Sequence, residues 1–218
     1  NGFSYSPTKA KASLVAAGYK DTNGDGFVEN KDGSPIELSI VVPNGWSDWM
    51  TAIQVISDSA KQVGIKITPA YPDYATLVDD RGHGRFDLVL GNDRQMSNTP
   101  WTYYQYIYNL PIADNQTTMN YQRYTDQTAF ALTQKLNRTP STNTKAYQAI
   151  LTSLQKRFLQ TLPAIPLWYN GMWSMVNTQY WTGWPSASEN QYTPSSWRNY
   201  FQMTSIDMLT HLPPAKAD

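Results

Sequence analysis

The sequence predicts a mixed α/β fold built on a mainly parallel β-sheet. Three observations indicate it. Short apolar or alternating segments typical of strands occur at residues 36–42, 65–71 and 86–90, segments with helical periodicity lie between them, and glycine or proline marks most of the boundaries. Because each strand is separated from the next by a helix, we expect neighbouring strands to be parallel and joined by right-handed crossovers.

The first helix is expected over residues 8–17. Ser6 followed by Pro7 is a helix-start signal, because the serine can cap the first turn and proline suits the first helical position. Apolar residues then recur at helical spacing until Gly18, which favours the end of a helix.

A β-α-β unit follows. Residues 36–42 alternate in the two-residue period of a strand and end at Pro-Asn-Gly. Ser47 is positioned to cap an amphipathic helix that closes at Gly64, directly before the strand 65–71. A shorter helix at 74–80 leads to the apolar strand 86–90, which completes the expected sheet.

The character of the chain changes after Gly91. Thr99-Pro100 favours the start of an aromatic helix, and the strongest helical pattern runs from Asn143 to Thr161, before Leu162-Pro163. From Pro166 the sequence is typical of short strands and loops and is rich in tryptophan. We therefore expect a first unit over residues 1–165 and a C-terminal extension over residues 166–218.

Composition narrows the class of protein. Seventeen basic and 17 acidic residues cancel to a net charge of zero, so bulk charge excludes a nucleic-acid binder. Only 16% of residues are charged while 13% are aromatic, which predicts a surface of neutral polar groups and rings. Cysteine is absent, which excludes disulfides, thiol nucleophiles and cysteine-bound zinc.

A calcium loop is the most specific motif. In DTNGDGFVENKD, oxygen-bearing side chains stand at positions one, three and five (Asp21, Asn23 and Asp25), glycine at six, the carbonyl of Phe27 at seven and Asp32 at twelve. This is the spacing with which a calcium loop wraps its ion. Two departures leave a metal-free Asx-rich turn as the alternative: position twelve is not glutamate, and a strand rather than a second helix follows.

Candidate ligand-binding residues follow the predicted strands. Trp46 and Trp49 lie where the first strand gives way to a helix, and Asn92, Asp93, Arg94 and Gln95 follow the strand 86–90. Crevices at the carboxyl ends of parallel strands are where α/β sheets bind ligands. Amides and carboxylates beside indoles suit a neutral, hydroxyl-rich ligand, because polar groups take the hydroxyls and rings cover the apolar faces.

No catalytic constellation is recognisable. The two histidines, His83 and His211, form no HExxH pair and lie near no GxSxG elbow. With only three glutamates, a glycosidase carboxylate pair cannot be argued either. We therefore expect a binding protein and no enzyme.

The order of several segments resembles a known family. Five segments occur in this order: AGYKDTNGDGFVENKDGSPIELSIVVP, a helix ending in VGIKI, FDLVLGNDRQMSNTPWTYYQY, a long helix and LPAIPLWYN. This order is similar to the C-terminal half of extracellular solute-binding proteins of family 5. These are the dipeptide-, oligopeptide- and oligosaccharide-binding receptors of ABC transporters. The resemblance implies a lobe of the periplasmic-binding-protein type II fold, with residues 166–218 returning to an N-terminal lobe that this chain lacks. It also implies an extracellular location, either periplasmic or as a cell-surface lipoprotein.

The resemblance also implies a ligand class. Peptide-binding members hold the ligand's amino group with an aspartate after the strand equivalent to 86–90, where this chain has Gln95, with Asp93 two residues earlier. NDRQMSNTPW is instead similar to members that bind β-linked gluco-oligosaccharides such as cellobiose. The resemblance thus predicts these sugar-contacting or stacking residues: Asn44, Trp46, Trp49, Asn92, Asp93, Arg94, Gln95 and Trp101.

The implied mechanism is capture between two lobes, followed by recognition of the closed form by a membrane permease. One lobe alone would hold half of the contacts, so we expect weak binding by this chain. Three alternatives stay open: a peptide receptor of the same family, a carbohydrate-binding accessory module or lectin, which would more often be all-β, and a hydrolase, which release of product from a cello-oligosaccharide would reveal.

Overall fold

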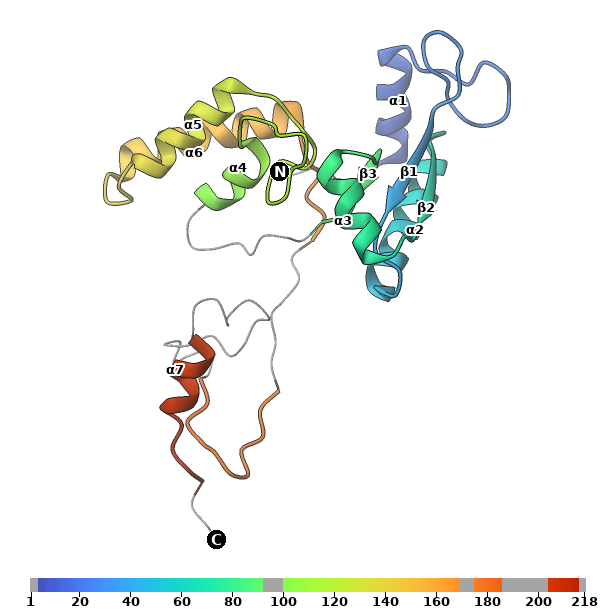
Figure 1. Ribbon diagram of the computed structural model, residues 1–218. Helices are drawn as coiled ribbons and strands as arrows, with labels where there is room; N and C mark the ends of the chain where they lie inside the picture. The colour runs from blue at the N-terminus through green and yellow to red at the C-terminus, as the bar shows by residue number, and fades with distance from the viewer. Residues whose placement is uncertain (1–3, 92–99, 169–174, 186–203, 216–218) are drawn as a thin grey trace. The chain divides into compact units, whose positions relative to one another are not determined.

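The computed structural model describes residues 4–91, 100–168, 175–185 and 204–215, without the side chains of residues 204, 205 and 207. The chain divides into two compact units, residues 1–165 and 166–218 (Figure 1). None of the described helices is long and apolar enough to cross a membrane.

The first unit begins with the expected α/β layer. Its sheet has the order β2-β1-β3, with both pairs parallel, and is formed by β1 (Glu37–Val41), β2 (Lys66–Ala70) and β3 (Leu88–Val89). Helix α2 (Ser47–Lys61) packs on the sheet through Ile53, which is fully buried against Ile40 and Val42. The parallel β-α-β arrangement is confirmed, although β3 is shorter than the predicted strand 86–90.

The helix boundaries follow local signals, with one exception. Helix α1 (Pro7–Ala17) is capped by Ser6, whose Oγ accepts from Lys9 N–H, and ends at Gly18 with φ of 92°. Helix α3 (Tyr74–His83) is capped by the Asp73 carboxylate. The prediction that Ser47 caps α2 is wrong, because the N-cap is Trp46, whose side chain makes no capping bond. The helix still gains Asp48 in its first turn, where a negative charge is favourable.

The rest of the described first unit consists mainly of helices, with a loop over residues 109–126. Helices α4 (Trp101–Tyr108), α5 (Gln127–Arg138) and α6 (Thr144–Thr161) lie side by side in Figure 1 and share one core. Fully buried Tyr108 and Leu154 lie in this core. Helix α5 was not predicted. Its buried face uses Ala129, Thr133 and Leu136, and the segment is amphipathic, so the sequence does carry a signal for this helix.

The described part of the second unit is small. It contains helix α7 (Thr204–Thr210) and an antiparallel bridge between Trp181 and Pro214. Met208 and Leu212 are its buried apolar residues, whereas Met175 and Tyr180 are 88% and 66% exposed. The expectation of short strands and loops here missed α7.

Candidate functional site

The carboxyl ends of β1 and β2 form a polar and aromatic edge of the sheet. The chain leaves β1 through buried Val42 and Pro43 and then exposes Asn44. The backbone N–H of Asn44 donates to the carbonyl of Pro72, which follows β2, over 2.8 Å. This bond ties the two strand ends together, and Gly45, with φ of 85°, turns the chain into α2. Such an edge is where open parallel sheets hold ligands.

An exposed aromatic pair stands at this edge. The rings of Trp46 and Tyr74 stack with centroids 5.8 Å apart and planes 18° from parallel. Trp46 is 36% and Tyr74 55% exposed, so both rings keep surface available to a ligand. Tyr74 is the first residue of α3, and its neighbour Asp73 fixes the start of that helix. We call Trp46 and Tyr74 the aromatic pair.

Trp49 supports this pair from beneath. Its ring meets Trp46 edge-on, with centroids 4.8 Å apart and planes at 76°. Only 7% of Trp49 is exposed, and it packs in the core with Ile40 and Ile53. This burial argues against Trp49 as a stacking surface: position 49 lies on the sheet-facing side of α2, whereas Trp46 precedes the helix. Trp49 positions Trp46 instead.

The Asp73 carboxylate makes the turn before α3 rigid. It accepts hydrogen bonds from the Thr76 hydroxyl at 2.6 Å and from the Thr76 backbone N–H at 3.0 Å. The bond from the Thr76 side chain, followed by the backbone bond, lowers the pKa of Asp73. Asp73 therefore stays ionised at neutral pH. Its carboxylate is engaged in capping α3, which fixes Tyr74 beside Trp46.

The other predicted ligand residues are distributed differently. Asn92, Asp93, Arg94 and Gln95 lie outside the described residues. Trp101 is half-buried at the start of α4 and packs against the helical core. Its Nε1 hydrogen is buried and meets no acceptor among the residues that the structure describes. The structure thus brings Asn44, Trp46 and Trp49 together, and adds Tyr74, which the sequence reasoning missed although it follows a strand by the same rule.

The loop of residues 21–32 gathers carboxylates. Ligand oxygens of Asp21, Asp25 and Glu29 lie within 4.8 Å of one another. Calcium holds its oxygens at roughly 2.3–2.6 Å, so three oxygens at such separations can share one ion. Asx turns shape the loop: Asp21 accepts from the N–H groups of Gly24 and Gly26, and the N–H of Asp25 donates to Asn23.

Asp32, the predicted twelfth ligand, lies apart from this group. Asp32 is outside the described carboxylate group, because its Oδ1 accepts from both the N–H and the hydroxyl of Ser34 in a separate turn. The third carboxylate of the group is Glu29, at position nine of the motif. Glu29 is 3% exposed and its Oε2 accepts from the N–H and hydroxyl of Thr22. The backbone of Glu29 pairs with Lys20 and with Pro35 in two antiparallel bridges, so the chain reverses direction between each pair.

Comparison with known proteins identifies the family of this chain. The sequence model of the bacterial extracellular solute-binding proteins, family 5 middle region, matches residues 1–115, which include the aromatic pair and the carboxylate loop. The chain belongs to this family of solute-binding proteins. Its parallel α/β architecture matches the periplasmic-binding-protein type II fold of the solved relatives and is unlike the all-β fold expected of a lectin.

Individual relatives differ in what they are described as binding. A Thermotoga maritima periplasmic oligopeptide-binding protein, solved with mannohexaose bound, is 35% identical, covers 99% of this chain and 40% of its own, and has a TM-score of 0.86. The oligopeptide-binding protein AppA of Bacillus subtilis is 31% identical over 92 residues, which are 41% of this chain and 17% of its own. A structure of AppA in complex with a nonapeptide shows the same fold, with a TM-score of 0.63 and 22% identity. The match covers 75% of this chain and 31% of AppA. The chain thus spans about 40% of the length of its Thermotoga relative.

Proposed function

We propose that this chain is a ligand-binding lobe of the substrate-binding component of an ABC importer, and that its ligand is a neutral oligosaccharide of the cellobiose or β-gluco-oligosaccharide class. Family membership supports the receptor role. The exposed aromatic pair carries the proposal for the ligand, because rings stacked at the carboxyl edge of a sheet offer apolar faces to a pyranose.

The hydrogen-bonding groups around the pair favour a sugar. The carboxylate of Asp73, beside Tyr74, is engaged by Thr76 in the cap of α3. Asn44, just after β1, offers an exposed amide. An amide both donates and accepts hydrogen bonds, as sugar hydroxyls require. The Thermotoga relative with mannohexaose bound supports an oligosaccharide ligand at 35% identity.

Capture requires a second surface. In this proposal an N-terminal lobe supplies the opposing contacts, residues 166–218 return to that lobe, and the closed form engages a membrane permease. The exposed side chains of Met175 and Tyr180 are consistent with a covering surface. The protein acts outside the cytoplasmic membrane, in the periplasm or as a cell-surface lipoprotein, and performs no chemistry on its ligand.

An oligopeptide is the second candidate ligand. The observation that favours it is the 31% identity with an oligopeptide-binding protein over 92 residues. A peptide has a terminal ammonium group that needs an anionic partner, and Asp93 is the carboxylate of this sequence nearest to the expected position, where Gln95 stands. The two candidates therefore differ in whether the site selects for that charge.

Calorimetric titration separates these candidates. The receptor that contains both lobes, here called the complete receptor, is titrated with cellobiose, longer gluco- and manno-oligosaccharides, and di- to pentapeptides. The proposal predicts that oligosaccharides bind and that peptides do not displace them. Binding of peptides alone would contradict the ligand class while leaving the receptor role intact. The 218-residue chain, titrated beside it, is expected to bind the same ligand weakly.

We further infer that the carboxylate loop binds a structural calcium ion. Asp21, Asp25 and Glu29 would supply side-chain oxygens, with Asn23 and the carbonyl of Phe27 completing the set. The loop joins α1 to β1, and the N–H of Val28 donates to the carbonyl of Gly64, over 2.7 Å. An ion there would hold the loop against the end of the α2 segment.

A further inference from the structure

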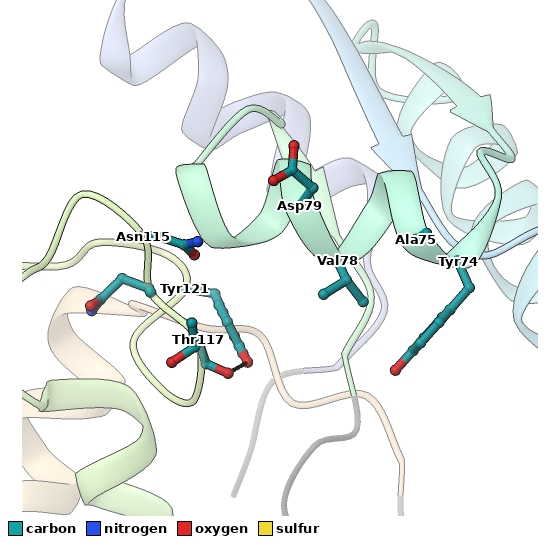
Figure 2. A pocket seen from close by; sticks show the side chains of 8 residues that line it. Tyr74, Ala75, Val78, Asp79, Asn115, Thr117 and Tyr121 are labelled. Carbon is teal, nitrogen blue, oxygen red and sulfur yellow. Dashed lines mark hydrogen bonds between the residues drawn. The ribbon is translucent and has the colours of Figure 1, made fainter.

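A pocket of about 420 Å³ opens between one face of α3 and the loop of residues 115–121 (Figure 2). Tyr74 and Val78 reach into it from the helix, and Thr117 and Tyr121 face them from the loop. This volume lies in the range of small-ligand sites, roughly 300 to 1,000 Å³. Tyr74 is the residue that the pocket shares with the aromatic pair.

The two walls are fastened together, so the pocket is formed in advance. The backbone N–H of Gln116 and the guanidinium of Arg123 both donate to the carbonyl of Gly82, each over 2.7 Å. The guanidinium of Arg81 lies 4.1 Å from the centre of the Tyr121 ring. A side chain at position 82 would meet Asn115 Oδ1 at 2.4 Å, so glycine allows this close approach.

The lining of the pocket is neutral. Among the described residues that border it, Asp79 is the one acidic residue, and its carboxylate is paired with Arg85 and with His83 at 3.2 Å. Figure 2 shows this carboxylate directed away from the space between Val78 and Thr117. What remains are the apolar surface of Val78 and the polar groups of Asn115 and Thr117. Such a wall suits a ring with hydroxyl groups rather than an ion.

Exposed apolar surface marks the same face. Tyr74 is 55% and Val78 39% exposed, one turn apart on α3. Tyr121 is held in place because its hydroxyl donates to the carbonyl of Thr117 over 2.8 Å. A ligand ring between these walls would cover Val78 and the free side of Tyr74 while hydrogen-bonding to the loop.

We propose that this pocket is a subsite for an additional sugar unit of an oligosaccharide that stacks on the aromatic pair. The inference rests on the proposed oligosaccharide ligand and adds a length preference to it. A short oligosaccharide reaches only the aromatic pair, whereas a longer one passes Tyr74 and places a further ring in the pocket. Affinity therefore rises with chain length until the pocket is filled.

A substitution that fills the pocket tests the subsite. In the complete receptor, Val78→Trp is compared with Val55→Trp, which makes the same change at a 59% exposed position of α2 that does not line the pocket. Both are titrated with gluco- and manno-oligosaccharides from two to six units. Val78→Trp is expected to abolish the gain in affinity with length and to leave the shortest binding ligand unaffected. Val55→Trp is expected to follow the wild type.

A second, milder variant distinguishes loss of the subsite from misfolding. Thr117→Val keeps the shape of the wall and removes one hydroxyl, so long ligands should bind about 3- to 10-fold more weakly and short ones unchanged. An unchanged length dependence in Val78→Trp and Thr117→Val, with sugar still bound, overturns the subsite alone. A wild-type receptor that binds no oligosaccharide overturns the proposed function as well.

Discussion

Trp46 and Tyr74 stack at 5.8 Å although 28 positions separate them in sequence, one at the end of β1 and the other at the end of β2. Parallel pairing of β1 with β2, in register from Glu37 with Lys66 to Val41 with Ala70, brings the two rings to one edge. Trp49 holds Trp46 from beneath. The pair is thus a consequence of strand register, and it forms the part of the proposed site that the described residues show in full.

Removal of either ring of the pair should weaken ligand binding. Trp46→Ala and Tyr74→Ala in the complete receptor are each expected to lower oligosaccharide affinity by about tenfold, which corresponds to about 1.4 kcal/mol. Tyr5→Ala, which removes another exposed tyrosine, is the control and should bind as the wild type does. Calorimetric titration measures the effect, and equal affinities for all three variants would contradict the assignment.

Trp49 should affect stability far more than Trp46 does. Trp49→Ala leaves a cavity beside Ile40 and Ile53 and is expected to cost about 3–5 kcal/mol of unfolding free energy. Trp46→Ala, at a 36% exposed position, should cost about 1 kcal/mol. Denaturant unfolding of the two variants checks the difference. Similar costs would mean that Trp49 is no core residue.

The sequence predicted the α/β layer well because its strands and α2 carry strong two-residue and helical periods. Helix α5 was missed although its segment is amphipathic and follows Asp126, whose side chain caps it. The candidate site was placed at the carboxyl edge of the sheet, since parallel strands end together. Tyr74 was not singled out, because only the pairing of β1 with β2 brings it to Trp46. Burial of Trp49 likewise follows from packing.

The ion pair of Asp126 and Arg157 should make stability depend on pH. Burial by itself raises the pKa of Asp126, whose side chain is 3% exposed, but hydrogen bonds from Arg157 and from Ala129 N–H outweigh it and lower the pKa. Asp126 thus releases its proton more readily when folded. Its contribution is complete above the unfolded pKa, near 3.9, and is lost as the pH falls through the lower folded value.

Asp126→Asn tests this pair. At pH 7 it should lower the unfolding free energy by about 2–3 kcal/mol, since a charged hydrogen bond and part of the α5 cap are lost. The difference from the wild type should shrink as the pH falls below about 4. Asp79→Asn, at an exposed ion pair, should cost less than about 1 kcal/mol. A difference that does not vary with pH would show that ionisation of Asp126 is not involved.

Calcium should raise the thermal stability of the protein, and chelation should lower it. Binding to the folded state alone stabilises by about 2.7 kcal/mol at a calcium concentration one hundred times the dissociation constant. Glu29→Gln is expected to abolish the shift in melting temperature, and Asp32→Asn to retain it, because only Glu29 joins Asp21 and Asp25. If calcium does not change the melting temperature of the wild type, the loop binds no calcium. If Asp32→Asn loses the shift, Asp32 is a ligand after all.

Gly84 should be sensitive to substitution because of Arg123. Gly84 has φ of 73°, and a Cβ there would lie 2.4 Å from Arg123 Nε. Gly33 has φ of 84° with open space around it. Gly33→Ala should therefore cost about 1–2 kcal/mol for the left-handed backbone alone, and Gly84→Ala more, because Arg123 must shift from its carbonyl partners. Denaturant unfolding measures both losses of unfolding free energy. Equal losses would show that Arg123 moves aside without a free-energy cost.

The most direct measurement for the proposed capture of a neutral oligosaccharide is a crystal structure of the complete receptor with its tightest-binding oligosaccharide. The account predicts a sugar ring stacked on the pair of Trp46 and Tyr74, with the N-terminal lobe closed over its opposite face. A sugar bound away from both rings, or a receptor that crystallises only with a peptide held there by its ammonium group, would contradict it.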